Sequence, residues 1–145
     1  DRNSFLGEMA CIISQRLVAK TCPYCRRKIV SPLNSKLPAR DLAVLEEGKY
    51  SYEAPGCPKC KQQGILGRVP VIEILVFDNE LRDYFSVQRG LVETGAFLRH
   101  KGFRTMWAMG MEYVAKGDIS LQELLSTLVP DDEIKEKGVM EQLCK

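Results

Sequence analysis

Two pairs of cysteines are the residues best suited to chemistry in this chain. They are Cys22-x-x-Cys25 and Cys57-x-x-Cys60, and 31 residues separate the pairs. Each CxxC turn lets two thiolates reach one metal ion. Two such turns complete a tetrahedral shell that leaves no position for water. The four cysteines are therefore predicted to hold a structural zinc ion.

Cysteine pairs also serve as redox dithiols and as disulfides, and both roles remain alternatives. A thioredoxin-like motif has one pair at the start of a helix, whereas here there are two, each with proline after its first cysteine. The interval between the two CxxC turns, here called the first and second knuckle, exceeds the commonest zinc-ribbon spacings. A small insertion must therefore lie between the knuckles. Cys11 and Cys144 have no partner pattern and are interpreted as a buried thiol and a tail residue.

The amino-acid composition limits the class of protein to which this chain can belong. With 145 residues, 45% of them hydrophobic, the chain can bury one modest core, and a net charge of +2 argues against bulk nucleic-acid binding. Neither a run of 18 apolar residues nor a signal-peptide pattern occurs, so a soluble cytoplasmic protein is expected. The segment 20–68 is rich in Lys and Arg, which would offset four thiolates or dock an acidic partner or phosphate.

Catalytic motifs are missing from the sequence. It has no GxxxxGK[ST] phosphate loop, no HExxH and no GxSxG, so we predict no catalytic or cofactor-binding residues and no enzyme activity of the chain by itself. Glu73 is the one carboxylate in an unusual place, within an apolar segment. We expect it to form an ion pair with Arg68 or Arg104; the alternative is a role at a neighbouring subunit or nucleotide site.

The elements that must position the cysteines begin with a predicted helix over residues 1–21. Its apolar residues follow helical spacing and it runs into the first knuckle. Pro38 should open a short helix between the knuckles, and residues 50–52 alternate like a strand. Residues 68–77 read as a strand covered on both faces, but the chain offers almost no neighbour for it.

Helices are predicted for the rest of the chain. Asp78 or Asn79, Thr105 and Ser120 are candidate N-caps, and Pro130 ends the last helix. The predicted fold is α+β and mostly helical: a zinc-bound tetracysteine insertion plus C-terminal helices. The predicted divisions are a terminal helix, a zinc-binding subdomain, a strand with a helical bundle, and a flexible tail, over residues 1–21, 22–61, 62–130 and 131–145.

Several segments together carry a resemblance to a known family. They are Gln15-Arg16-Leu17-Val18, the two knuckles, Gly64-Ile-Leu-Gly67-Arg68, Glu73, Gly102-Phe-Arg-Thr105 and the segment 117–123. In order and spacing they resemble the C-terminal portion of the traffic ATPases of type II secretion and type IV pilus assembly. The resemblance covers about residues 5–129.

The resemblance implies a fragment of a larger ATPase. In that family a RecA-like motor domain with its phosphate loop, acidic boxes and histidine box precedes the matching segment. One or two strands here would then belong to a RecA-like sheet whose remainder lies upstream, and ATP and magnesium would bind only in the parent protein. The tetracysteine element is a zinc-binding excursion, and Cys22, Cys25, Cys57 and Cys60 match its ligands.

The family also implies partners and a location. Its members are bacterial homohexamers that power pseudopilus or pilus assembly for protein secretion. They contact an inner-membrane platform or a cytoplasmic recruiting protein, without membrane insertion and with no nucleic acid. Departures such as Ile65 and Met109-Gly110 leave the secretion, pilus or competence pathway open. The alternative is a free-standing zinc-ribbon module that binds nucleic acid or a partner protein.

Overall fold

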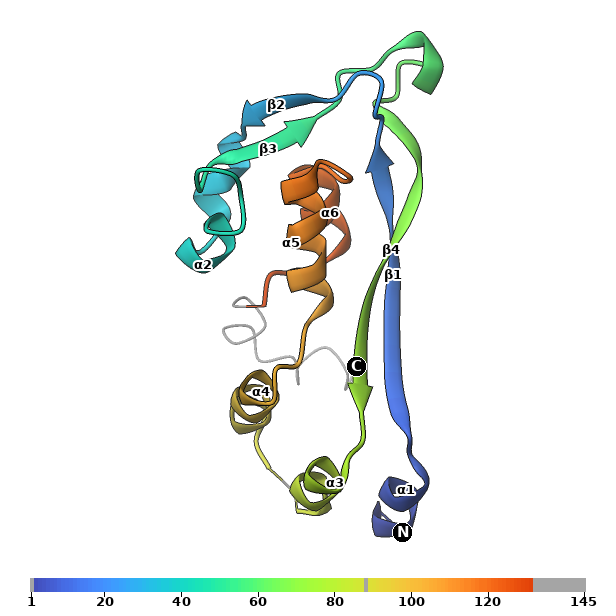
Figure 1. The fold of residues 1–145 in the computed structure, drawn as a ribbon, viewed down its shortest axis with the longest axis vertical. Coiled ribbons are helices and arrows are strands. Elements are labelled where there is room, and N and C mark those ends of the chain that lie inside the picture. Colours follow the sequence, from blue (N-terminus) through green and yellow to red (C-terminus); the bar gives the residue numbers. More distant parts are fainter. Residues whose placement is uncertain (1, 88, 132–145) are drawn as a thin grey trace, which may run out of the picture.

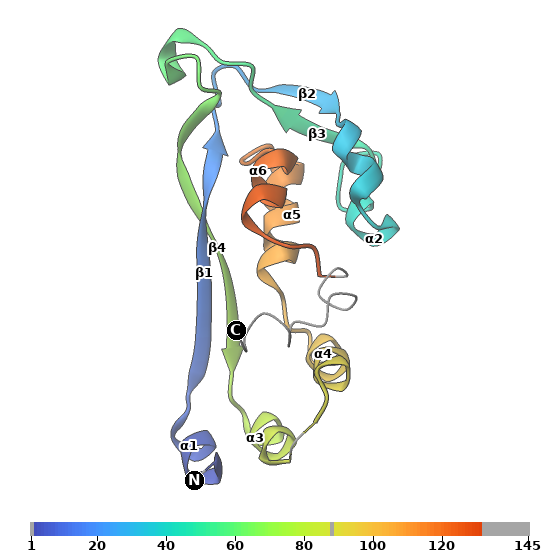
Figure 2. The same ribbon diagram turned by 180° about the vertical axis from the view of Figure 1, so that it is seen from behind.

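A long two-stranded ribbon organises the computed structural model, which describes residues 2–87 and 89–131. Strands β1 (Cys11–Thr21) and β4 (Ile65–Val76) form this ribbon, and a second strand pair leans across one of its ends (Figures 1 and 2). Helices lie beside the ribbon and at its other end. The predicted α+β class is confirmed.

The ribbon is antiparallel, with pairing from Cys11 opposite Val76 to Thr21 opposite Ile65 and one irregularity after Ala19. Because side chains alternate between the faces of a strand, its two faces differ. Val18 and Val71 are buried against the helices. The opposite face carries large apolar side chains that are 52–66% exposed: Ile13, Leu17, Ile74 and Val76.

The prediction of one helix over residues 1–21 is wrong. Helix α1 (Arg2–Glu8) is short, and residues 11–21 form β1. The segment is rich in β-branched residues, and its apolar positions also fit the two faces of a strand once β4 is available to pair with it. The strand that was expected to lack a neighbour therefore has one in this chain, although one of its faces is exposed.

The segment between the knuckles forms a hairpin with a helical excursion. Strand β2 (Arg27–Val30) pairs with β3 (Tyr50–Glu53), which confirms the predicted strand at residues 50–52. A 3₁₀ helix, η1 (Pro32–Lys36), and the short helix α2 (Ala39–Leu42) lie between them. As predicted, α2 begins directly after Pro38.

Within the described residues four helices follow β4, and the caps predicted for three of them are confirmed. They are α3 (Asn79–Ser86), α4 (Leu91–His100), α5 (Met106–Lys116) and α6 (Leu121–Thr127). The side chains of Asp78, Thr105 and Ser120 accept backbone N–H groups at the starts of α3, α5 and α6. Among the helices of the described ranges, none is long and apolar enough to cross a membrane.

Glu73 binds a helix start rather than a basic side chain, so its predicted ion pair is wrong. Its Oε2 accepts the backbone N–H of Met106 at 3.1 Å, while Arg104 pairs with Glu112. The first N–H groups of a helix lack partners within the helix and favour a nearby negative charge. Glu73 therefore attaches the N-terminus of α5 to β4.

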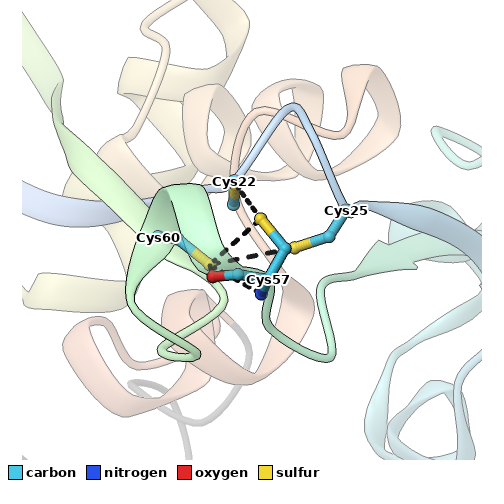
Figure 3. Close-up of side chains that lie close together, drawn as sticks. All are labelled: Cys22, Cys25, Cys57 and Cys60. Atoms are coloured by element: carbon cyan, nitrogen blue, oxygen red, sulfur yellow. Dashed lines mark hydrogen bonds between the residues drawn. The ribbon is translucent and has the colours of Figure 1, made fainter.

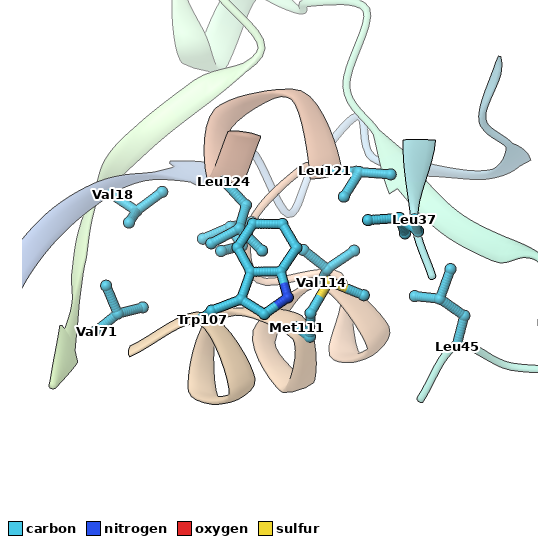
Figure 4. Packing of buried hydrophobic residues seen from close by; sticks show 10 residues of the cluster. Val18, Leu37, Leu45, Val71, Trp107, Met111, Val114, Leu121 and Leu124 are labelled. Carbon is cyan, nitrogen blue, oxygen red and sulfur yellow. The ribbon is translucent and has the colours of Figure 1, made fainter. Parts of the chain in front are cut away.

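Two hydrophobic clusters lie toward opposite ends of the ribbon. The larger contains Trp107 and joins the ribbon, α5, α6 and the inter-knuckle segment (Figure 4); its buried members are Val18, Leu37, Leu45, Val71, Trp107, Met111, Val114, Ile119, Leu121 and Leu124. The smaller contains Leu6, Phe77 and Leu81 and joins α1 to α3. The predicted division boundaries remain predictions, and the predicted tail lies outside the described residues beyond Asp131.

Candidate metal centre

The structure brings the four predicted cysteines together (Figure 3). The sulfur atoms of Cys22 and Cys57 are 3.9 Å apart, as are those of Cys25 and Cys60, and the sulfurs of Cys57 and Cys60 are 3.7 Å apart. All four sulfurs lie within 4.8 Å of one another. Four thiolates at 2.3 Å from a tetrahedral zinc ion are about 3.8 Å apart. The donor set could therefore hold a metal ion.

Backbone hydrogen bonds form the two knuckles at the end of the ribbon. The Arg26 N–H donates to Cys22 O at 3.0 Å and closes the first turn. The Cys60 N–H donates to Cys57 O at 3.1 Å in η2 (Pro58–Cys60), which forms the second. The Cys22 N–H donates to Gly64 O at 2.8 Å, so the two knuckles are fixed to each other.

The thiols differ in acidity because of their surroundings. Burial alone would raise the pKa of Cys60, but backbone N–H groups of Cys57 and Gly64 donate to its sulfur and lower its pKa to about 6. Burial raises the pKa of Cys25 to about 12, although the Gly56 backbone acts in the opposite direction. Cys60 is therefore the more acidic of these two thiols, and a metal ion would displace the proton from Cys25.

Basic side chains near the knuckles contact carboxylates and an aromatic ring rather than the cysteine sulfurs. Arg27 pairs with Glu53, Lys28 pairs with Glu46, and the Lys59 ammonium lies 4.0 Å from the Tyr24 ring centroid. In the described ranges, the N–H groups that donate to a cysteine sulfur are backbone groups, those of Cys57 and Gly64. The expected charge compensation therefore involves no direct contact, and backbone donors were not predicted because the sequence pattern does not specify them.

Gly64 is required where the two knuckles meet. Its φ is +70°, and a Cβ built on it would lie 2.2 Å from the Ala54 carbonyl oxygen. We expect Gly64→Ala to lower the free energy of unfolding by more than about 3 kcal/mol, since left-handed strain of about 1–3 kcal/mol is added to a backbone clash. Urea unfolding of the metal-loaded protein measures this.

Gly67→Ala is the matched control for that substitution. Gly67 also has positive φ, at +85°, but a Cβ added to it would have no neighbouring atom within 4 Å. Gly67→Ala should therefore show the backbone strain alone. Equal losses of stability for the two variants would contradict the proposed close approach at Gly64.

Comparisons with known proteins show the family of this chain. The family described as "Type II/IV secretion system protein" matches residues 3–126. The chain belongs to this family. The predicted resemblance to type II secretion and type IV pilus-assembly ATPases is thereby confirmed.

Curated relatives of this secretion-system family member come from several bacteria. It is 30% identical to "Type IV pilus assembly ATPase PilB" of Thermus thermophilus over 81% of this chain and 13% of that protein. It is 31% identical to "Type II secretion system protein HxcR" of Pseudomonas aeruginosa over 85% of this chain and 21% of that protein. It is 34% identical to "Putative type II secretion system protein E" of Escherichia coli over 84% of this chain and 24% of that protein. The chain thus spans less than a quarter of each of these relatives.

Of the other two cysteines of this family member, the structure describes only Cys11. Cys11 is exposed at the start of β1, so its interpretation as a buried thiol is wrong. The five described cysteines are free, with no disulfide among them. Cys144 lies outside the described residues.

Proposed function

We propose that this chain is the C-terminal portion of a hexameric bacterial ATPase that powers pseudopilus or pilus assembly for protein secretion. Family membership and the names of the relatives support this role. The chain supplies a structural zinc element and helices for subunit or platform contacts. ATP and magnesium bind elsewhere in the longer protein, and the chain alone hydrolyses no ATP.

The grouping of four thiols within 4.8 Å is the observation that carries the zinc assignment. Four thiolates suit zinc, and a site with four protein ligands keeps no open position for substrate. Cys22, Cys25, Cys57 and Cys60 would hold the ion. It would join the end of β1 to the start of β4 and close the hairpin segment between them.

The proposed partners are neighbouring subunits of a homohexameric ring and an inner-membrane platform or recruiting protein. The chain would therefore act at the cytoplasmic side of that membrane through its partners. The alternative of a nucleic-acid-binding ribbon gains little from the structure. Tyr50 and Tyr52 are half-buried, and each ring lies beside a basic side chain rather than on an open platform.

Metal content tests the proposal directly. We expect one zinc per chain by elemental analysis of protein purified without chelator. A thiol reagent should find four thiols protected in the native state and released on denaturation, because bound thiolates do not react. A chain without metal, with these cysteines free or oxidised in pairs, would overturn the structural zinc site and favour a redox role.

A further inference from the structure

Three consecutive carbonyl groups at the end of α5 are bound by residues on both sides of the first knuckle. The Thr21 N–H donates to Asp118 O at 2.8 Å. The Arg26 guanidinium donates through Nη1 to Gly117 O at 2.9 Å and to Lys116 O at 3.3 Å. Thr21 directly precedes Cys22, and Arg26 directly follows Cys25.

These carbonyls need partners from outside the helix. The last C=O groups of a helix have no intrahelical donor, and the C-terminal end of the helix dipole favours a positive charge. Gly117 ends α5 in the left-handed conformation, with its own N–H bonded back to Tyr113 O and Val114 O. Arg26 brings a guanidinium to this end of α5, and it comes from a segment 91 residues earlier in the chain than Gly117.

The position of the Arg26 guanidinium depends on the shape of the first knuckle. The backbone N–H of Arg26 closes the turn by donating to Cys22 O, so the turn that presents the two thiols also aims the guanidinium. Tyr52 of β3 completes the contact. A Cβ added to Gly117 would lie 2.7 Å from the Tyr52 ring, and Arg26 lies 5.5 Å from the centroid of that ring.

We propose that the first knuckle is a metal-dependent C-terminal cap of α5. This inference rests on the proposed binding of metal by the four cysteines. When the metal leaves, the turn from Cys22 to Arg26 is no longer held, and the end of α5 loses its donors. Coupling between two sites is reciprocal, so disturbing the end of α5 should also weaken metal binding.

The matched pair Arg26→Met and Arg27→Met tests the cap in the full, zinc-loaded chain. Hydrogen exchange followed by mass spectrometry reports on residues 113–118. We expect about tenfold faster exchange there for Arg26→Met, since a hydrogen bond from a charged donor is lost, with one zinc per chain retained. Arg27→Met should leave this segment unchanged, because Arg27 pairs with Glu53 on the hairpin.

Removal of the metal by a chelator is the second test of the cap. Metal removal from the unmodified chain should speed exchange at residues 113–118 together with residues 22–26, and it should add little at residues 113–118 in Arg26→Met. Helix α3, which belongs to the other hydrophobic cluster, is the internal reference and should keep its protection. Unchanged exchange at residues 113–118, while the knuckles respond to chelation, would overturn the cap and leave the structural zinc site intact.

Reciprocity gives an independent readout. Gly117→Ala places a Cβ against Tyr52 in a strained conformation and should make zinc roughly three- to tenfold easier to extract by a competing chelator. Unchanged zinc affinity in this variant would overturn the coupling. A chain that binds no metal at all would overturn the cap together with the proposed zinc site, and metal analysis distinguishes that result from the others.

Discussion

Cys22→Ser is expected to abolish stoichiometric zinc binding and to cause a large loss of stability. Cys22 is buried, and its sulfur lies within the group of four. A structural zinc site contributes on the order of 10 kcal/mol to the fold that it closes, and losing one of four ligands removes much of this. Thermal unfolding with metal analysis on the same sample measures both effects.

Cys11→Ser is the matched control for that experiment. Cys11 is exposed and lies at the opposite end of β1 from the knuckles, so its substitution should change neither zinc content nor melting. Treatment of the unmodified chain with a chelator should reproduce the Cys22→Ser result. Unchanged zinc content and melting in Cys22→Ser would show that the four-cysteine assignment is wrong.

Trp107→Ala is expected to lower the free energy of unfolding by about 3–5 kcal/mol, the usual range for removing a large buried aromatic side chain. Trp107 is 2% exposed at the centre of the larger cluster. Its Nε1–H donates to Asp41 Oδ2 at 2.7 Å, so truncation also leaves a buried carboxylate oxygen without this donor. Urea unfolding of the zinc-loaded protein measures the loss.

Trp107→Phe separates the two contributions. It keeps most of the apolar contact in the cluster but removes the donor to Asp41, so a smaller loss of about 1–3 kcal/mol is expected. The larger cluster joins α5 to the inter-knuckle segment, so a substitution of Trp107 could also disturb the cysteines. Zinc content is therefore measured as a control and must stay at one per chain in both variants. A loss below about 1 kcal/mol for Trp107→Ala would contradict the packing around α5.

Local signals in the sequence predicted the helices after β4 well. Asp78, Thr105 and Ser120 act as caps in the structure because a capping side chain bonds only a few residues along the chain. The same reasoning failed for β1. Its apolar spacing fits a helix and a strand, and the choice depends on pairing with β4, which lies far along the chain.

The candidate metal centre shows a similar contrast. The grouping of the four cysteines could be predicted, because each CxxC spacing by itself brings two sulfurs close together. The backbone donors to Cys60, the contact of Gly64 with Ala54 and the capping of α5 by Arg26 could not. Each depends on how separate segments of the chain meet in the fold, and no local pattern encodes that.

The placement of the two hydrophobic clusters toward opposite ends of the ribbon has a consequence for cooperativity. They have no buried residue in common, and the strands β1 and β4 run from one to the other. A single melting temperature describes the molecule only when the strand pairing couples the two ends into one transition. Loss of the proposed zinc ion would act at one end, so the metal-free chain should melt in separate steps while α3 remains folded.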